Sequence, residues 1–321
     1  MNFKVLSIGG VLQEIIYNTD AADVIWQPMR RQSKKMIAVD YGAKISSNQV
    51  WRSYGGGALN SLATFNSLGL KCAPVSIIGD DLAGHEILHY LAKRKVCTKF
   101  IEVDKTKETA FSFILNLPED NEHVVFVSQG VLNKFRFKKV LLKHHRADWL
   151  YITSLRGNGA EFNLREIFHY AKDQAVKIFW NPGQQQINNF NKYLKYLNRV
   201  AFLSLNLQEA KILTGLLKLS DKSVSTLAKF LIESGCQAVL ITKGVAGVEL
   251  YTAQKVYKQP GKKVKVINTT GAGDAFNAAF LSGYIIYQGD YQVALQLGVR
   301  NAVAVIQTIG AHQGVLTKKD L

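Results

Sequence analysis

The second half of the chain alternates short apolar runs with helical segments. Beyond residue 130, the runs DWLYITS, VKIFWNP, VAFLSLN and QAVLITKG are each followed by a stretch of helical character. Strand, helix and strand in succession form a βαβ unit, and repeated units build a parallel sheet with helices on both faces. The pattern therefore predicts an α/β protein with a three-layer core and a largely parallel central sheet.

Two other regions are rich in strands and poor in helix. Residues 11–53 and 98–128 show strand-like alternation, interrupted by turn residues such as LPEDNE. We interpret them as two insertions that form one small β lid over a core made of residues 1–10, 54–97 and 129–321. Because a small sheet with bulky residues exposes its edges, we also expect a homodimer formed through the lid.

The composition is typical of a soluble globular protein, with 47% hydrophobic and 20% charged residues. No apolar run approaches the length of a membrane span, and the start of the chain does not resemble a signal peptide. The three cysteines, Cys72, Cys97 and Cys236, include no CxxC pair. We therefore expect a cytoplasmic protein without a zinc site.

A net charge of +16 is the one unusual bulk property. Basic residues cluster at 30–35, 134–146 and 255–265, and such clusters suit nucleic acid, an acidic membrane surface or an anionic substrate. No nucleic-acid-binding motif accompanies them, so nucleic acid is not expected to be the main ligand. The histidines His85, His89, His144 and His145 lie in amphipathic or basic stretches and are not expected to bind metal.

Small, amide and acidic residues follow the predicted strands. Ligands of parallel sheets bind at the carboxyl ends of the strands, and a polyhydroxylated or phosphorylated ligand requires residues of these types. They are Gly9, Gly10 and Glu14, then residues 55–57 and Asn60, then residues 181–183, then Asn206 and Glu209, then residues 242–247, and finally residues 268–274.

The stretch VINTTGAGDAFNAAF places an aspartate directly behind a turn of small residues, where an apolar helix begins. The backbone N–H groups of Gly271, Ala272 and Gly273 can converge on a phosphate, and the helix adds the positive end of its dipole. Asp274 would then accept the proton of an alcohol that attacks the phosphorus. A plain turn capped by Asp274 is the alternative, and spacing alone does not decide between them.

Other nucleotide-binding and hydrolytic signatures are absent. The chain contains neither GxxxxGK[ST] nor a GxGxxG fingerprint after its first strand, and it lacks HExxH and GxSxG. A phosphate site in this chain must therefore use different machinery.

The segments GGGALNSLATFNSLG and VINTTGAGDAFNAAF closely resemble the two signatures of the PfkB-type, ribokinase-like sugar kinases. The supporting segments follow in a similar order, so the resemblance covers essentially the whole chain. It implies a Rossmann-like, ribokinase-like core with a β lid. It also implies ATP- and Mg²⁺-dependent phosphorylation of a hydroxymethyl group on a sugar or sugar-like small molecule.

The resemblance also implies roles for individual residues. Asp274 matches the catalytic base, and the anion hole matches Gly271, Ala272 and Gly273. The positions that bind the nucleotide match Asn206, Glu209, Thr242, Gly244, Gly247 and Asn301, with Glu209 acting on magnesium through water. The positions that bind the acceptor match Glu14, Gly56, Gly57 and Asn60. A monovalent cation would be bound near Asn268 and Thr270.

Three departures from the family pattern affect these roles. Glu14 stands where an aspartate is usual, so the acceptor pocket is expected to be shifted. Asn268 also replaces an aspartate, which argues against activation by potassium. Gly57 stands where ribokinases carry a lysine, which argues against ribose as the acceptor.

The identity of the acceptor stays open among hexoses, pentoses, sugar acids, sugar phosphates and nucleosides. A phosphorylated acceptor would require a basic residue in the lid, for which Arg52 is the candidate. The alternatives to a sugar kinase are a nucleoside kinase of the same fold and a catalytically silent homologue that senses a sugar or nucleotide. The intact GAGD turn favours an enzyme, because a binding protein gains nothing from a carboxylate beside phosphate.

Overall fold

The computed structural model describes residues 2–27, 34–47, 49–117, 122–219, 221 and 223–321. The turn within LPEDNE and the basic residues Arg30 and Arg31 therefore lie wholly or partly outside the described residues. Within the described ranges, none of the helices is both long and apolar enough to cross a bilayer.

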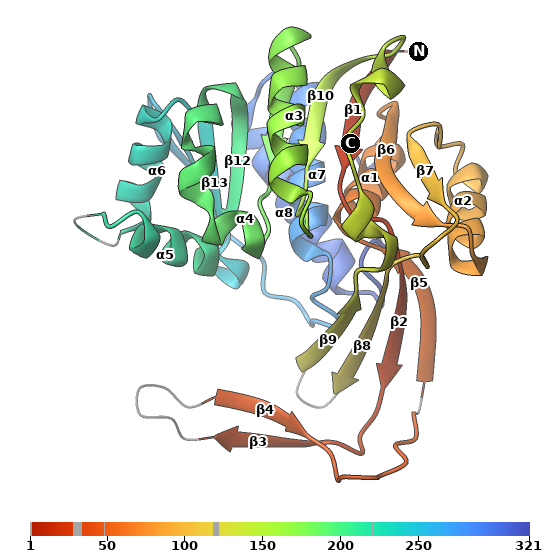
Figure 1. Ribbon diagram of the computed structural model, residues 1–321. Helices are drawn as coiled ribbons and strands as arrows, with labels where there is room; N and C mark the ends of the chain where they lie inside the picture. Colours follow the sequence, from red (N-terminus) through yellow and green to blue (C-terminus); the bar gives the residue numbers. More distant parts are fainter. Residues whose placement is uncertain (1, 28–33, 48, 118–121, 220, 222) are drawn as a thin grey trace.

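A nine-stranded sheet forms the centre of the molecule (Figure 1). Pairing is parallel from β7 through to β13, whereas β14 and β15 are antiparallel. The largely parallel sheet predicted from the sequence is confirmed. In spatial order its strands are β15 (Val256–Gln259), β14 (Val248–Thr252), β13 (Ala238–Thr242), β12 (Val200–Asn206), β11 (Lys177–Trp180), β10 (Arg146–Ile152), β1 (Asn2–Ile8), β6 (Cys72–Gly79) and β7 (Ile101–Asp104).

Helices cover both faces of this sheet. One face packs against α3 (Ala160–Asp173), α4 (Gln184–Asn188), α5 (Leu207–Leu216) and α6 (Val224–Glu233). The other packs against α1 (Gly57–Ser67), α2 (Leu82–Lys93), α7 (Ala272–Ile286) and α8 (Tyr291–Ile306). Short 3₁₀ helices span Gly130–Lys134, Lys139–Leu142, Phe190–Arg199, Gly244–Ala246 and Lys318–Asp320.

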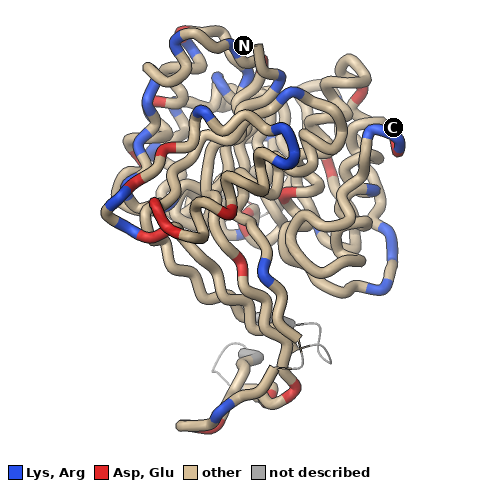
Figure 2. Tube along the Cα trace, turned by 90° about the vertical axis from the view of Figure 1, so that its right-hand side faces the viewer, with Lys and Arg blue, Asp and Glu red and all other residues tan. Residues whose placement is uncertain are grey.

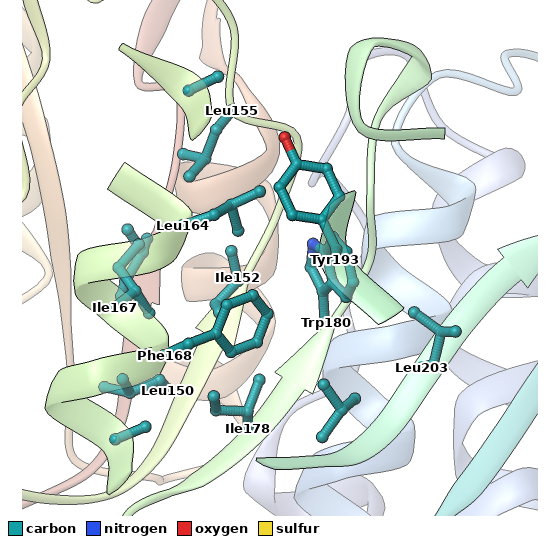
Figure 3. Packing of buried hydrophobic residues seen from close by; sticks show 14 of the residues in the cluster. Leu150, Ile152, Leu155, Leu164, Ile167, Phe168, Ile178, Trp180, Tyr193 and Leu203 are labelled. Carbon is teal, nitrogen blue, oxygen red and sulfur yellow. The ribbon is translucent and has the colours of Figure 1, made fainter. Parts of the chain in front are cut away.

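Each face of the sheet has its own apolar core because successive side chains of a strand point to opposite faces. In β10, Leu150 and Ile152 join the core under α3, whereas Trp149 and Tyr151 join the core under α1 and α7. Figure 3 shows the first of these cores, with Phe168 from α3 beside Trp180 from β11. A strand buried on both faces reads as a continuous apolar run, which is why these strands could be found in the sequence.

The lid is a four-stranded sheet that projects from the carboxyl ends of the central strands, as Figures 1 and 2 show from two directions. Its strands in spatial order are β5 (Gln49–Gly55), β2 (Leu12–Asn18), β8 (Phe111–Leu117) and β9 (Glu122–Ser128). A separate two-stranded sheet pairs β3 (Asp23–Gln27) with β4 (Lys34–Ala38) at the far end of the lid.

Two details differ from the lid boundaries that the sequence suggested. Residues 98–128 were assigned to the lid as a whole, but β7 within them pairs with β6 at the edge of the central sheet. The residues of β3 and β4 form their own hairpin instead of joining the single lid sheet. Alternation identifies a strand but does not say which neighbour it pairs with, so neither difference was visible in the sequence.

The base of the lid is tied to the core by Asp81, the N-cap of α2. Its Oδ1 accepts hydrogen bonds from the Gly84 backbone N–H at 2.8 Å and the Thr109 hydroxyl at 2.6 Å. Its Oδ2 accepts a third from the Thr109 backbone N–H at 2.8 Å. Since Thr109 lies two residues before β8, one carboxylate both caps a core helix and positions the start of a lid strand.

Candidate active site

A cavity of about 240 Å³ lies where the lid meets the core. Its walls come from the carboxyl end of β1, the start of α1, the lid strands, the loop after β10 and the start of α7. The polar residues that line it are Glu14, Asn60, Ser112, Gln129, Ser154, Arg156, Thr270 and Asp274, and four glycines, Gly9, Gly10, Gly56 and Gly57, complete one wall. A larger hollow of about 680 Å³ at the amino ends of β10 and β11 contains none of the predicted site residues.

Asp274 lies in the first turn of α7 and contributes its carboxylate to the cavity. The Asn60 Nδ2 group donates a hydrogen bond to Asp274 Oδ2 at 3.0 Å, which fixes the carboxylate relative to α1. Burial raises the pKa of Asp274 to about 6, against the opposing effect of the Asn60 hydrogen bond. At neutral pH the group is mostly ionised, and its raised pKa makes it a better proton acceptor than an ordinary aspartate.

The turn before α7 requires glycine at its N-cap. Gly271 has a φ of 78°, in the left-handed region, and an added Cβ would lie 2.1 Å from the Ala311 carbonyl oxygen. A Cβ at Gly273 would meet nothing within 4 Å, so the space beside this residue is open. The first turn of a helix leaves backbone N–H groups without intrahelical partners, although here the Ala272 N–H donates to the Thr269 carbonyl at 3.3 Å.

Glu14 in β2 places a second carboxylate in the same cavity. The side chain is only 4% exposed, and burial, with the negative charge of Asp274 as the second cause, raises its pKa to about 7. A Cβ at Gly55 would lie 2.1 Å from Glu14 Oε1, so the carboxyl group rests directly on the glycine backbone. The position of Glu14 therefore depends on a small residue in the adjacent strand β5.

Side-chain polar atoms without a partner converge on this cavity. In the part of the chain that the structure describes, seven buried side-chain nitrogen or oxygen atoms lack a hydrogen-bond partner. Four of them belong to cavity residues: Glu14 Oε2, Asn60 Oδ1, Ser112 Oγ and Thr270 Oγ1. An unpaired buried polar atom costs about 1–3 kcal/mol, so this concentration indicates a binding site for a polar ligand.

The residues predicted to bind the nucleotide lie along the carboxyl edge of β12 and β13, outside this cavity. Asn206 ends β12 and is in register with Thr242 at the end of β13. Asn206 Oδ1 accepts from the Glu209 N–H, and Glu209 Oε2 accepts from the Asn206 N–H, both at 2.8 Å. The two residues therefore form a reciprocal capping box at the start of α5, which gives the pair a structural role. Gly244 and Gly247 follow in the turn between β13 and β14.

Asn301 is not brought to the cavity. It is fully buried in α8, where its Nδ2 donates to Thr64 Oγ1 at 3.2 Å and to the Ala275 carbonyl at 2.9 Å. Its Oδ1 accepts from the Leu316 N–H at 2.8 Å. These hydrogen bonds tie α8 to α1, to α7 and to the C-terminal segment, so the structure gives Asn301 an architectural position.

The predicted monovalent-cation residues are only partly free. Asn268 Oδ1 accepts the Thr270 backbone N–H at 2.7 Å, whereas the Thr270 hydroxyl is buried and unpaired. Among the described residues, no group of three or more His, Cys, Asp or Glu side chains is arranged to hold a metal ion.

Several cavity residues were not singled out from the sequence: Ser112, Gln129, Ser154 and Arg156. Ser112 lies on the lid, and the other three lie in loops. Their contribution depends on how the lid is placed over the core, which no short motif encodes.

A carboxylate at a helix start, in a cavity between an α/β core and a β lid, is the arrangement of an enzyme that acts on a small molecule. The profile of the pfkB family carbohydrate kinases matches residues 25–318, and the chain belongs to this family. It is therefore a phosphotransferase with an alcohol group as acceptor.

Known proteins of similar sequence or fold include ribokinases, nucleoside kinases and other sugar kinases. The chain is 28% identical to the ribokinase of Mus musculus over 287 residues, which cover 87% of this chain and 86% of that protein. The nucleoside kinase of Methanocaldococcus jannaschii has the same fold, with a TM-score of 0.76 and 22% identity over 99% of this chain and 96% of that one. A chain from Escherichia coli in complex with ATP and Mg²⁺ also shares the fold, with a TM-score of 0.75, 18% identity, and 99% and 97% coverage. These likenesses confirm the predicted ribokinase-like fold.

Proposed function

We propose that this enzyme transfers the γ-phosphoryl group of ATP to a hydroxymethyl group of a sugar or sugar-like molecule, with Asp274 as the general base. The observation that carries the proposal is the position of the Asp274 carboxylate. It lies at the start of α7, accepts a hydrogen bond from Asn60, and shares a cavity with four unpaired polar atoms. A hydroxylated acceptor would satisfy those atoms and present one hydroxyl to Asp274.

The protein's own residues are assigned three tasks: orienting the acceptor, accepting its proton and stabilising negative charge. Glu14, Asn60 and Ser112 would orient the acceptor, and Asp274 would take the hydroxyl proton as the new O–P bond forms and the bond to the leaving ADP breaks. The backbone N–H groups at the start of α7 would stabilise the negative charge on the transferred group. The open space beside Gly273 leaves room for a phosphate to approach them.

The residues proposed to hold MgATP are Asn206, Glu209, Thr242, Gly244 and Gly247, and MgATP supplies the phosphoryl group. Burial raises the pKa of Glu209, against the hydrogen bond that its carboxylate accepts from the Asn206 N–H. The likeness to the E. coli chain in complex with ATP and Mg²⁺ supports this assignment. Asn268 brings no charge, and its side-chain oxygen already accepts a hydrogen bond, which supports activity without a strict requirement for potassium.

A nucleoside acceptor is the second candidate, and the likeness to the M. jannaschii nucleoside kinase supports it. ADP release from MgATP across a panel of sugars, sugar acids, sugar phosphates and nucleosides decides between the two. We expect release that depends on one acceptor class and is abolished in Asp274→Asn. MgATP binding without release on any acceptor would favour a sensing homologue instead.

We also propose that the enzyme is a homodimer formed through the outer face of the lid, the face turned away from the cavity. In the strand register, Arg52, Ile15, Phe113 and Phe126 form one row on this face. Phe126 is 56% exposed, and Val50, Phe111 and Val124 are also exposed there. An apolar sheet face of this kind is commonly covered by a partner.

We propose the cytoplasm as the compartment. The three cysteines are free, which is typical of proteins in a reducing compartment.

A further inference from the structure

Among the residues that the structure describes, Arg156 is the one cationic residue that lines the cavity between lid and core. Of its lining residues only Glu14, Asp274 and Arg156 carry ionisable groups. Arg156 is exposed and has no hydrogen bond or ion pair with any residue that the structure describes. Unpaired arginines are common on protein surfaces, so its place in the cavity wall and the way its backbone is held decide what it does.

The backbone on both sides of Arg156 is clamped by two glutamines of α4. Gln185 Oε1 accepts from the Gly157 N–H, and Gln185 Nε2 donates to the Gly157 carbonyl, both at 3.1 Å. Gln186 Nε2 donates to the Leu155 carbonyl. Gly157 has a φ of 82°, which favours glycine at this point. Arg156 therefore extends from a loop whose path is defined before any ligand binds.

The other basic candidate, Arg52, faces away from the cavity. Glu14 is opposite Ser53 and Ser112, and Ser112 is opposite Val127, so these four residues share the cavity face of the lid. Arg52 is one position along β5 and belongs to the opposite face. The arginine that the sequence suggested therefore belongs to the outer face of the lid, because the direction of a side chain in a sheet depends on its register.

We propose that Arg156 binds an anionic substituent of the acceptor, a carboxylate or a phosphate ester, so that the preferred acceptor is an anionic polyol. This inference rests on the proposed function. The planar guanidinium group presents paired N–H donors that match the oxygens of both anions. Glu14 and Asp274 hold negative charge in the same cavity, and a cation on a separate loop lets an anionic acceptor bind despite them. A neutral sugar would leave this cation without an anionic partner in the cavity wall.

The test compares each anionic acceptor with its neutral parent. One arm pairs sugar acids with the neutral sugars of the same carbon number, and the other pairs sugar monophosphates with the free sugars, so that carboxylate and phosphate are distinguished. The readout is the ratio of kcat/KM for the anionic acceptor to that for its neutral parent, in the wild type, Arg156→Gln, Arg156→Lys and Arg52→Gln. Calorimetric binding of the same compounds to the same proteins is measured in parallel.

In the wild type we expect kcat/KM to be higher for the anionic acceptor than for its neutral parent, either with the sugar acids or with the sugar monophosphates. Arg156→Gln should lower that ratio roughly 10- to 100-fold, mainly through KM, because a hydrogen-bonded charge is lost. Arg156→Lys should retain part of it, and Arg52→Gln should leave it unchanged.

A neutral sugar or nucleoside that is turned over better than every anion would overturn the inference and leave the proposed function intact. A ratio unchanged in Arg156→Gln would overturn it as well. If no compound is phosphorylated, the proposed function fails, and the binding data still decide the role of Arg156. Anions that bind no better than their parents, or equally well to Arg156→Gln, would refute it.

Discussion

Glu14 and Asp274 contribute two carboxyl groups to one small cavity, and both have raised pKa values. Burial is the main cause for each, and the charge of Asp274 adds to the effect on Glu14. A protein gains no stability from a buried, partly unpaired carboxylate, so these residues are explained by what they bind. The loss of folding stability caused by these buried carboxylates should be measurable in the protein without ligand.

Glu14→Gln should stabilise the free protein above neutral pH and weaken acceptor binding. The pKa of Glu14 is about 7 in the folded state against 4.5 ordinarily, so its contribution to stability is complete below pH 4.5 and is lost as pH rises through 7. The advantage of the variant in unfolding free energy should therefore grow by up to about 3 kcal/mol between about pH 4.5 and 8.

Urea unfolding of both proteins at several pH values measures this difference. Glu233→Gln, at an exposed position on α6, is the matched control and should show no such trend. A pH-independent difference between Glu14→Gln and the wild type would mean that Glu14 is ionised without penalty in the folded state.

At the residue scale, the sequence predicted the carboxylates and the amide of the cavity better than the loop residues that complete its wall. Asp274, Glu14 and Asn60 were all predicted, and the structure places them in one cavity. Asn301, predicted to lie beside the nucleotide, is buried among α1, α7 and the C-terminal segment, and its role at the nucleotide stays a prediction. Arg156 was not singled out because it lies in a loop without a motif, and only the folded chain brings it to the same cavity as Glu14.

The start of α7 is the element on which the account of phosphate binding depends, and two glycines there have different requirements. Gly273→Ala adds a methyl group to open space within a helix, so it should be neutral or stabilising by up to about 1 kcal/mol. The same methyl group would stand where the phosphate is proposed to approach. We expect kcat/KM for MgATP to fall by at least about tenfold.

Gly271→Ala is the matched comparison for this prediction. Its φ of 78° and the nearby Ala311 carbonyl oxygen make any side chain costly, so stability should fall by about 1–3 kcal/mol. Thermal unfolding and steady-state kinetics on both variants separate the two effects. Full activity in Gly273→Ala would show that the phosphate does not bind at this turn.

Strands and helices were predictable at the element scale wherever burial imposes a clear pattern. The strands β10 to β13 are apolar on both faces and were all identified. The pairing of β7 with β6, and the separate β3–β4 hairpin, depend on contacts between segments distant in sequence or on turns that no local pattern specifies. Register also decided that Arg52 faces outward, which the sequence alone could not show.

At the scale of the whole molecule, part of the basic surface is engaged in ion pairs, although the net charge of +16 already includes the acidic partners. Within the basic stretch 134–146, Lys134 pairs with Asp104 at 3.2 Å, Lys139 with Glu166 at 3.3 Å, and Lys138 with Glu102. Figure 2 shows lysines and arginines scattered around the core and interrupted by acidic residues. This distribution supports the expectation that nucleic acid is not the main ligand.

If the outer face of the lid is the dimer interface, a charge introduced on that face should weaken dimerisation. Phe126→Glu places a carboxylate on the outer face of the lid, in its edge strand β9, and it should weaken dimerisation by at least roughly tenfold because apolar burial is lost. Val140→Glu changes a still more exposed apolar residue on the core and should have no effect. Sedimentation velocity over a concentration series measures both. A wild-type chain that sediments as a monomer throughout would refute the dimer.

The most direct test of the whole account is Asp274→Asn, studied by turnover and by nucleotide binding on the same preparation. Asparagine keeps the size of the side chain and an oxygen that can accept the hydrogen bond from Asn60, but it cannot take a proton. We predict that kcat with the best acceptor falls by about 10²- to 10⁴-fold, while calorimetric affinity for MgATP stays within about twofold of the wild type. A variant that retains its kcat would show that Asp274 has only a structural role in the first turn of α7 and that the base lies elsewhere.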